Sequence, residues 1–238
     1  MNNNTTALQW KVRSAIQIVQ SKYHKNPWIF MTEADVQCAI YSELSKHVSK
    51  ARKTISCDIY GSKINANDFQ LLTNPLHAEL ATSRRKSTEF VDLCLLVPCK
   101  VYSVVKKRKY NRNNNELSIW EFLWEPKDSI GIEIKFNRWI PKISVYSRLT
   151  KRLRITEQWK YHRRRLIQDI SKLKRYKRGW LIFVDHHSLF RGYDEWRTFM
   201  EKIIRDSNYG RAKKTLNAYY LCPKHKRALS FKSPGKSF

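Results

Sequence analysis

The segment Trp180–Asp185, with the sequence WLIFVD, constrains the fold of this chain more than any other. It follows Gly179, consists of apolar residues up to its final acid, and is short. A short run of this kind is typical of a strand that is buried on both faces of a sheet. Such a strand requires helices on either side, so we expect an α/β domain with a central sheet flanked by helices.

Patterns on both sides of this strand predict the order helix, strands, helix, strand, helix, strand. Thr32 and Asp35 form a variant of the capping box, which predicts that a helix begins at Glu33 and runs to about residue 50. Residues 1–6 read as a disordered start, and helical spacing follows over 8–19. The other expected elements are strands over 76–81, 90–97, 130–136 and 216–221, and helices over 156–176 and 194–205.

The chain has no internal repeat and no long linker, so its 238 residues are expected to form a single domain over 1–238. We place the core at about 28–221. Residues 100–128 contain KKRK and NRNNN between two β-like segments, which predicts a basic hairpin insertion. Residues 222–238 are expected to form a basic tail.

The charge of the chain indicates a polyanionic partner. Its 47 Lys and Arg residues against 20 Asp and Glu residues give a formal net charge of +27. Nucleic acid suits such a surface. No apolar stretch long enough to span a bilayer and no basic-then-apolar leader is present. We therefore expect a soluble intracellular protein of the nucleoid or cytoplasm, with no membrane partner.

Residues 131–136, GIEIKF, place an acid and a base on one face of a strand. Because side chains alternate along a strand, Glu133 and Lys135 face one side while Ile132, Ile134 and Phe136 face the other. The chain contains one other Glu-x-Lys, but a proline lies at its centre, which favours a surface turn.

A second acid lies in an equally apolar setting upstream. Asp92 is surrounded by Phe, Val, Leu and Cys, although Asp is depleted in strands. If its strand neighbours that of Glu133, two carboxylates meet, and a divalent cation resolves their repulsion. Asp92 and Glu133 would then bind Mg²⁺ or Mn²⁺, with the Ile134 carbonyl as a third ligand. Lys135 would orient the attacking water and stabilise the negative charge on the phosphate.

Asp92 in VDLCLL and Glu133-Ile-Lys135 in GIEIKF resemble the motif of the PD-(D/E)XK, or restriction-endonuclease-like, nucleases. TEADVQCAIYSEL, HAEL and QDISKL add to this resemblance. It implies an αβββαβ core, metal binding by Asp92 and Glu133, and a catalytic role for Lys135. It also implies a glutamate from the first helix, with Glu33 preferred and Glu43 in reserve. The implied activity is that of a divalent-metal-dependent DNA endonuclease.

Other interpretations of the same residues stay open. The enzyme could be structure-selective for branched DNA, or the chain could be a nucleic-acid-binding protein with an inactive nuclease-like core. Asp92 and Glu133 could form structural ion pairs with Lys135 or a nearby Arg. Glu33 could act only through the helix dipole. Asp169 and Lys172, three apart on a helix, are expected to form a surface pair.

Basic runs in the sequence are expected to contact phosphates. DNA is the preferred partner and RNA the alternative, and a homodimer would suit the cutting of duplex DNA. The residues that we assign to phosphate contact are Arg84, Arg85, Lys86, Lys107, Arg108, Arg138, Arg152, Arg154, Arg163 and Arg164.

Overall fold

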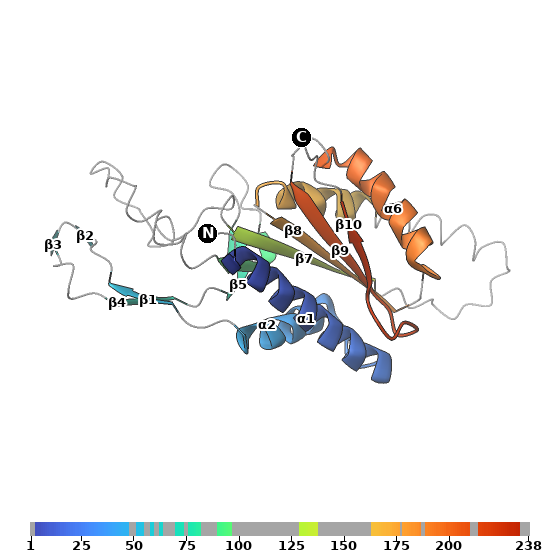
Figure 1. Ribbon diagram of the computed structural model, residues 1–238, viewed down its shortest axis with the longest axis horizontal. Helices are drawn as coiled ribbons and strands as arrows, with labels where there is room; N and C mark the ends of the chain where they lie inside the picture. Colours follow the sequence, from blue (N-terminus) through green and yellow to red (C-terminus); the bar gives the residue numbers. More distant parts are fainter. Residues whose placement is uncertain are drawn as a thin grey trace.

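The protein forms an α/β fold in which helices flank a mixed, open sheet of six strands (Figure 1). This computed structural model describes residues 3–47, 51–54, 58–59, 62–63, 70–73, 76–81, 90–96, 129–137, 163–176, 178–186, 189–209 and 214–233. The predicted hairpin insertion at 100–128 lies outside the described residues.

The sheet has the strand order β10-β9-β8-β7-β6-β5. β5 and β6 are antiparallel, as are β6 and β7, whereas β7, β8 and β9 run parallel and β10 is antiparallel to β9. The carboxyl ends of β7, β8 and β9 therefore lie at one edge of the sheet. The bounds are β5 Leu76–Ala81, β6 Phe90–Leu96, β7 Ser129–Asn137, β8 Arg178–Asp185, β9 Thr215–Leu221 and β10 Leu229–Lys232.

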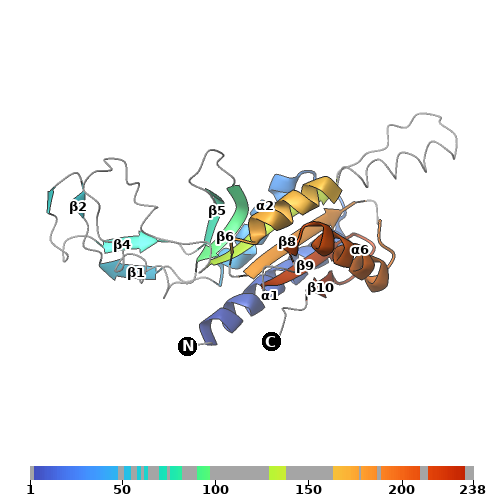
Figure 2. The same ribbon diagram turned by 90° about the horizontal axis from the view of Figure 1, so that it is seen from above.

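Two layers of helices cover the sheet (Figures 1 and 2). Helices α1 (Asn3–Lys25) and α2 (Glu33–Ser45) pack on one face and supply one hydrophobic cluster. On the other face lie α6 (Tyr193–Asp206) and the helix that includes residues 163–173, called the central helix below.

Strand β8 is buried on both faces, as its apolar sequence predicts. Trp180, Ile182 and Val184 belong to the cluster under α1 and α2. Leu181 and Phe183 belong to the cluster under the central helix and α6. The burial of both faces explains why this strand has no alternation of polar and apolar residues.

Most predicted element bounds are confirmed to within a few residues. The capping box of Thr32 and Asp35 is present, but α2 ends at Ser45 instead of residue 50. Helix α1 begins at Asn3, so the expectation of a disordered start over 1–6 was wrong for residues 3–6. The central helix is described only from residue 163 onward.

Two segments contain strands that the sequence did not predict. β10 lies in the expected basic tail and pairs with β9, because alternate residues of LSFK pack inward. Between α2 and β5, short strands form two antiparallel pairs, β1 with β4 and β2 with β3. Their bounds are β1 Ala51–Thr54, β2 Asp58–Ile59, β3 Ser62–Lys63 and β4 Gln70–Thr73. No helix in the described ranges is long and apolar enough to cross a membrane.

Candidate active site

Asp92 and Glu133 occupy neighbouring positions on adjacent strands. The β6–β7 ladder runs from Leu96 opposite Ser129 to Leu93 opposite Ile132, so the next position in this register sets Asp92 against Glu133. At this position the Asp92 side chain takes the place of a backbone acceptor: the Ile134 backbone N–H donates to Asp92 Oδ2 at 2.5 Å. The predicted meeting of strands β6 and β7 at these acids is confirmed.

Glu33 reaches the same place from the first turn of α2. Lys135 Nζ donates to Glu33 Oε2 at 3.0 Å and to Oε1 at 3.2 Å. The Phe136 N–H donates to Glu33 Oε2 at 3.1 Å. Because the capping box fixes the start of α2, this glutamate is held against β7. Glu33 therefore contacts the candidate site directly and does more than complement the helix dipole.

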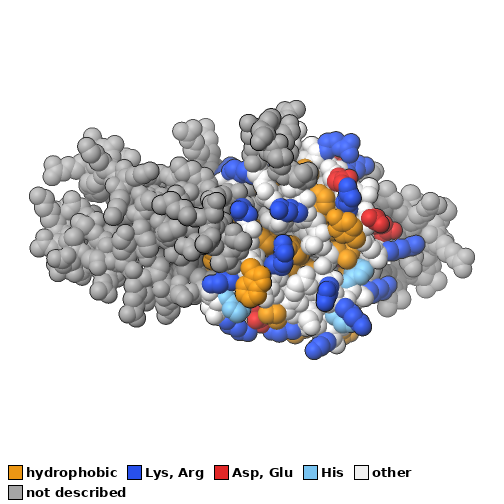
Figure 3. Space-filling view, viewed as in Figure 1, with side chains coloured by type: hydrophobic (Ala, Val, Ile, Leu, Met, Phe, Trp, Pro, Cys, Tyr) orange, Lys and Arg blue, Asp and Glu red, His pale blue; other side chains and the backbone are white. Residues whose placement is uncertain are grey.

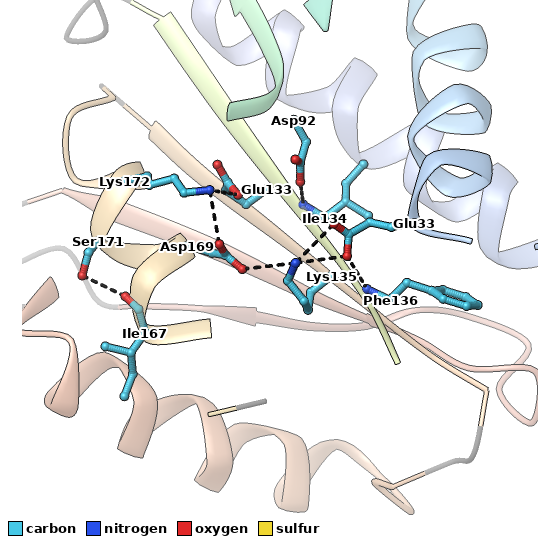
Figure 4. Close-up of polar contacts among 10 residues, drawn as sticks. All are labelled: Glu33, Asp92, Glu133, Ile134, Lys135, Phe136, Ile167, Asp169, Ser171 and Lys172. Atoms are coloured by element: carbon cyan, nitrogen blue, oxygen red, sulfur yellow. Dashed lines mark hydrogen bonds and ion pairs between the residues drawn. The ribbon is translucent and has the colours of Figure 1, made fainter. Parts of the chain in front are cut away.

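The central helix adds two residues that the sequence analysis assigned to the surface. Lys172 Nζ lies 3.1 Å from Glu133 Oε2 and 3.3 Å from Asp169 Oδ1. Asp169 Oδ2 lies 3.7 Å from Lys135 Nζ. Figure 4 shows these groups together around β7. The expected pairing of Asp169 with Lys172 is confirmed, but its expected place at the surface was wrong, because Asp169 is buried and faces the sheet.

A signal for this placement was present in the helical period. Leu166, Ile170 and Leu173 form the buried stripe of the central helix. Asp169 lies three residues after Leu166 and four before Leu173, which places it on that same face. Lys172 lies three residues beyond Asp169. Both residues should therefore have been assigned to the sheet side.

The site contains more acid than base. Four carboxyl groups, those of Asp92, Glu133, Glu33 and Asp169, lie around the two ammonium groups of Lys135 and Lys172. If all of them ionise, the formal charge is −2, in a protein whose net charge is +27. Glu133 is 1% exposed, so water screens little of this excess.

This excess changes the pKa values of the site. Burial raises the pKa of Glu133 to about 9, and the charges of Asp92 and Asp169 add to the effect. Burial also raises the pKa of Asp92 to about 7, against the hydrogen bond from Ile134. Burial alone would lower the pKa of Lys135 and Lys172, but the surrounding carboxylates outweigh it and raise both. The lysines are thus held in the charged form.

The donor set fits a divalent cation at Asp92 and Glu133. Glu133 Oε1 is buried and has no hydrogen-bond partner in the described part of the chain. A cation would satisfy this oxygen and offset the negative charge of the ionised carboxylates. Within the described ranges, no group of three or more His, Cys, Asp or Glu side chains is arranged around one metal position. A cation at Asp92 and Glu133 therefore needs further ligands, such as water or phosphate oxygens.

Glu43 does not take part in the site. It is buried and pairs with Lys22 at 2.6 Å and Lys46 at 2.9 Å, which joins α2 to α1. Ten residues of helix separate it from Glu33, about 15 Å. The reserve assignment of Glu43 was wrong, because its partners are Lys22 of α1 and Lys46 at the end of α2 and not residues of the site.

Only two of the ten predicted phosphate-binding residues are described. Arg163 pairs with Asp206 of α6, and its Nε lies 3.0 Å from Asp206 Oδ2. Arg164 is exposed. Figure 3 shows Lys and Arg side chains spread over the described face, with few acids among them. The other eight, Arg84, Arg85, Lys86, Lys107, Arg108, Arg138, Arg152 and Arg154, lie outside the described residues.

Comparisons with known proteins provide no identification. The chain matches no protein-family model, no curated protein and no solved structure.

Proposed function

We propose that the protein is a divalent-metal-dependent endonuclease that hydrolyses phosphodiester bonds, with DNA as its substrate. The observation that supports this most is the enclosed excess of carboxyl groups around Asp92 and Glu133. When ionised, these carboxylates outnumber the two lysines beside them, and their burial has a cost that raises the pKa values of Asp92 and Glu133. The carboxylates would have a function if they bound a divalent cation that in turn binds a phosphodiester.

The order of elements supports a restriction-endonuclease-like core. Helix α2, strands β5, β6 and β7, the central helix and β8 occur in the αβββαβ order, with the two short strand pairs, β1 with β4 and β2 with β3, inserted between α2 and β5. Asp92 lies on the second of these strands and Glu133-Ile-Lys135 on the third. Glu33 lies on α2, the first helix of this core. The positions of all four residues agree with those expected from the resemblance.

Asp92 and Glu133 would hold the metal ion. The chemistry that bound Mg²⁺ or Mn²⁺ supplies is polarisation of a phosphate oxygen and a lowered pKa of bound water. The Ile134 carbonyl stays a predicted third ligand, and the N–H of the same residue fixes the Asp92 carboxylate by donating to Oδ2.

Lys135 would act on the phosphate. Its ammonium group stays protonated because Asp169 and Glu33 flank it, so it can stabilise the charge that grows on the phosphate oxygens. The two flanking acids also position the ammonium group. Lys172 would balance the charge of Glu133 before the metal ion binds.

A nucleic-acid-binding protein with an inactive core is the second candidate. The observation that favours it is the ion-pair network, in which Lys172 and Lys135 already partner Glu133, Asp169 and Glu33. In that case the acids would serve only to anchor α2 and the central helix to β7.

Cleavage of supercoiled plasmid separates the two candidates. The wild-type protein is expected to nick plasmid with Mg²⁺ and to leave it intact with a chelator. Asp92→Asn, which keeps the side-chain shape, is expected to lose the nicking while it retains binding in a gel-shift assay. Tight binding without cutting of DNA or RNA in either metal would overturn the nuclease proposal and favour the inactive core.

A further inference from the structure

The segment Trp28–Met31 is unusually apolar for a surface loop. The exposed fractions are 68% for Trp28, 42% for Ile29 and 45% for Met31. Phe30, in contrast, is buried and packs against Tyr23 with ring centroids 5.4 Å apart. The loop is thus anchored by one side chain and presents three others to solvent, which we call the apolar platform.

The platform is held in a defined shape by hydrogen bonds and by a ring contact. The Ile29 N–H donates to the Asn26 carbonyl at 3.1 Å, and the Met31 N–H donates to Asp35 Oδ2 at 2.8 Å. The Trp28 ring lies 4.8 Å from that of His186, which directly follows β8. A preorganised aromatic side chain binds a partner at a low entropic cost.

A cluster of cations adjoins the platform. His24 Nδ1 lies 2.7 Å from the Pro223 carbonyl oxygen, which brings the turn between β9 and β10 against the end of α1. The exposed side chains of Lys224, Lys226 and Arg227 belong to this turn, and the exposed Lys25 directly follows His24. Among the described residues none of the four has an ion-pair partner, and we call them the basic turn cluster.

The platform and the candidate site share one edge of the sheet. Met31 is two residues from Glu33, about 7 Å along the chain, and Glu33 contacts Lys135. His186 and the turn after β9 follow the carboxyl ends of parallel strands. In open α/β sheets this edge is where ligands bind.

We propose that the apolar platform binds an unpaired stretch of nucleic acid next to the bond that is cut, with bases stacked on Trp28 and phosphates on the basic turn cluster. Every base has a face that can stack on an aromatic ring, and cations that track the backbone supply affinity without sequence preference. This inference depends on the proposed function and narrows its substrate to DNA with a single-stranded segment.

The alternatives fit the surface less well. A second copy of the chain would bring the same cations face to face, at a cost in like-charge repulsion. A lipid surface would match the cations and the apolar side chains. However, the platform lies at the edge of the sheet that contains Glu33 and Lys135, so a lipid surface bound there would also lie against the candidate site.

Binding in chelator tests the platform without cleavage. The probes are a fluorescein-labelled oligothymidylate and a blunt duplex of the same length, followed by anisotropy. Trp28→Ala is expected to weaken binding of the oligothymidylate roughly tenfold. Trp28→Phe should restore most of this affinity, and binding of the blunt duplex should change little.

Trp10 offers a matched control, because it is 64% exposed on α1 and lies about 22 Å along that helix from its end. Trp10→Ala is expected to bind both probes like the wild type. Lys224→Gln with Lys226→Gln should lower the salt dependence of oligothymidylate binding by a slope of about 1 to 2.

Four results would overturn the inference. Three of them concern Trp28→Ala: unchanged binding of oligothymidylate, an equal loss of binding for the blunt duplex, and a changed sedimentation coefficient, which would assign the platform to a contact between copies. The fourth is a wild-type protein that binds anionic vesicles and not oligothymidylate, which would assign the platform to lipid. If Asp92→Asn loses plasmid cleavage but binds oligothymidylate normally, both the nuclease proposal and the platform proposal are supported. If the wild type binds oligothymidylate but never cuts, only the nuclease proposal is refuted.

Discussion

Two buried carboxylates on adjacent strands have opposite surroundings. Asp185, at the end of β8, is fully buried and accepts hydrogen bonds from neutral donors. These are Asn137 Nδ2 at 3.0 Å, the Leu189 N–H at 2.6 Å and the Tyr220 hydroxyl at 2.6 Å. Glu133, on β7, has one lysine on Oε2, acids nearby, and no hydrogen bond to Oε1 from any described residue.

The difference separates a carboxylate that supports the fold from one that is suited to chemistry. Donors satisfy both oxygens of Asp185, so the group needs nothing further. Glu133 has an unsatisfied oxygen and a raised pKa, which are properties that cluster at functional sites. The fold thus tolerates the cost of an unsatisfied buried oxygen at Glu133 and avoids that cost at Asp185.

Replacing Lys135 is expected to have the largest effect on activity. Lys135→Ala should slow plasmid cleavage by on the order of 10²- to 10³-fold, because one charge-stabilising group is lost from the transition state. Lys46→Ala, which removes an exposed partner of Glu43, should cleave at the wild-type rate. Initial cleavage rates at matched protein concentrations measure both, and equal rates for the two variants would remove Lys135 from the mechanism.

Replacing Asp185 is expected to affect stability instead. Asp185→Ala removes the acceptor of the hydrogen bonds from Asn137, Leu189 and Tyr220 and should lower the free energy of unfolding by about 3 kcal/mol. Urea unfolding followed by circular dichroism measures this loss. At urea concentrations too low to unfold it, the variant should bind Mg²⁺ like the wild type. Weakened metal binding in folded Asp185→Ala would erase the distinction between the two acids.

The stability of the metal-free protein is expected to fall as the pH rises. In the folded state the pKa of Asp92 is about 7 and that of Glu133 about 9, both above the ordinary values. Between the two pKa values of each group the folded protein holds a proton that the unfolded chain has released. This stabilisation is complete below the ordinary pKa values of 3.8 and 4.5, and it is lost progressively as the pH rises from there to about 7 for Asp92 and about 9 for Glu133. Added Mg²⁺ should raise Tm more at pH 9 than at pH 6.

Glu133→Gln provides the control for this pH dependence, because it keeps the shape and removes the titrating group. Its Tm with chelator should vary less between pH 6 and pH 9, and Mg²⁺ should raise it little. Differential scanning calorimetry with Mg²⁺ and with chelator gives both values. A Mg²⁺ effect as large in Glu133→Gln as in the wild type would place the metal ion elsewhere.

Replacing Glu43 is expected to have the smallest effect. Glu43→Gln weakens the pairs with Lys22 and Lys46, whose side chains are about half exposed, so the free energy of unfolding should fall by about 1 kcal/mol. Thermal unfolding of the two proteins measures it. Metal binding and cleavage should not change, and a loss of either would return Glu43 to the site.

The sequence predicts the strands and the central acids well, because their signals are local. The uninterrupted apolar run of β8 and the alternation in β7 reflect burial directly. Asp92 and Glu133 stand out because a charged residue in a buried strand requires a partner. The capping box of Thr32 fixes the start of α2 and so the place of Glu33.

The partners of these acids could not be predicted as well, because they come from distant segments. Lys172 meets Glu133 across 39 residues, and Lys135 meets Glu33 across 102. An acid and a base three residues apart on a helix read as a surface pair unless the helix face is assigned first. Strand β10 was missed because four residues between charged turns give a weak pattern.

Anomalous scattering from crystals of the protein grown or soaked with Mn²⁺ tests the central claim most directly. We expect one strong peak within about 2.0–2.3 Å of an oxygen of Asp92 and of Glu133 Oε1, with Lys172 Nζ displaced from Glu133. Bound Mn²⁺ elsewhere, with the Lys172–Glu133 ion pair intact at full Mn²⁺ occupancy, would contradict the account.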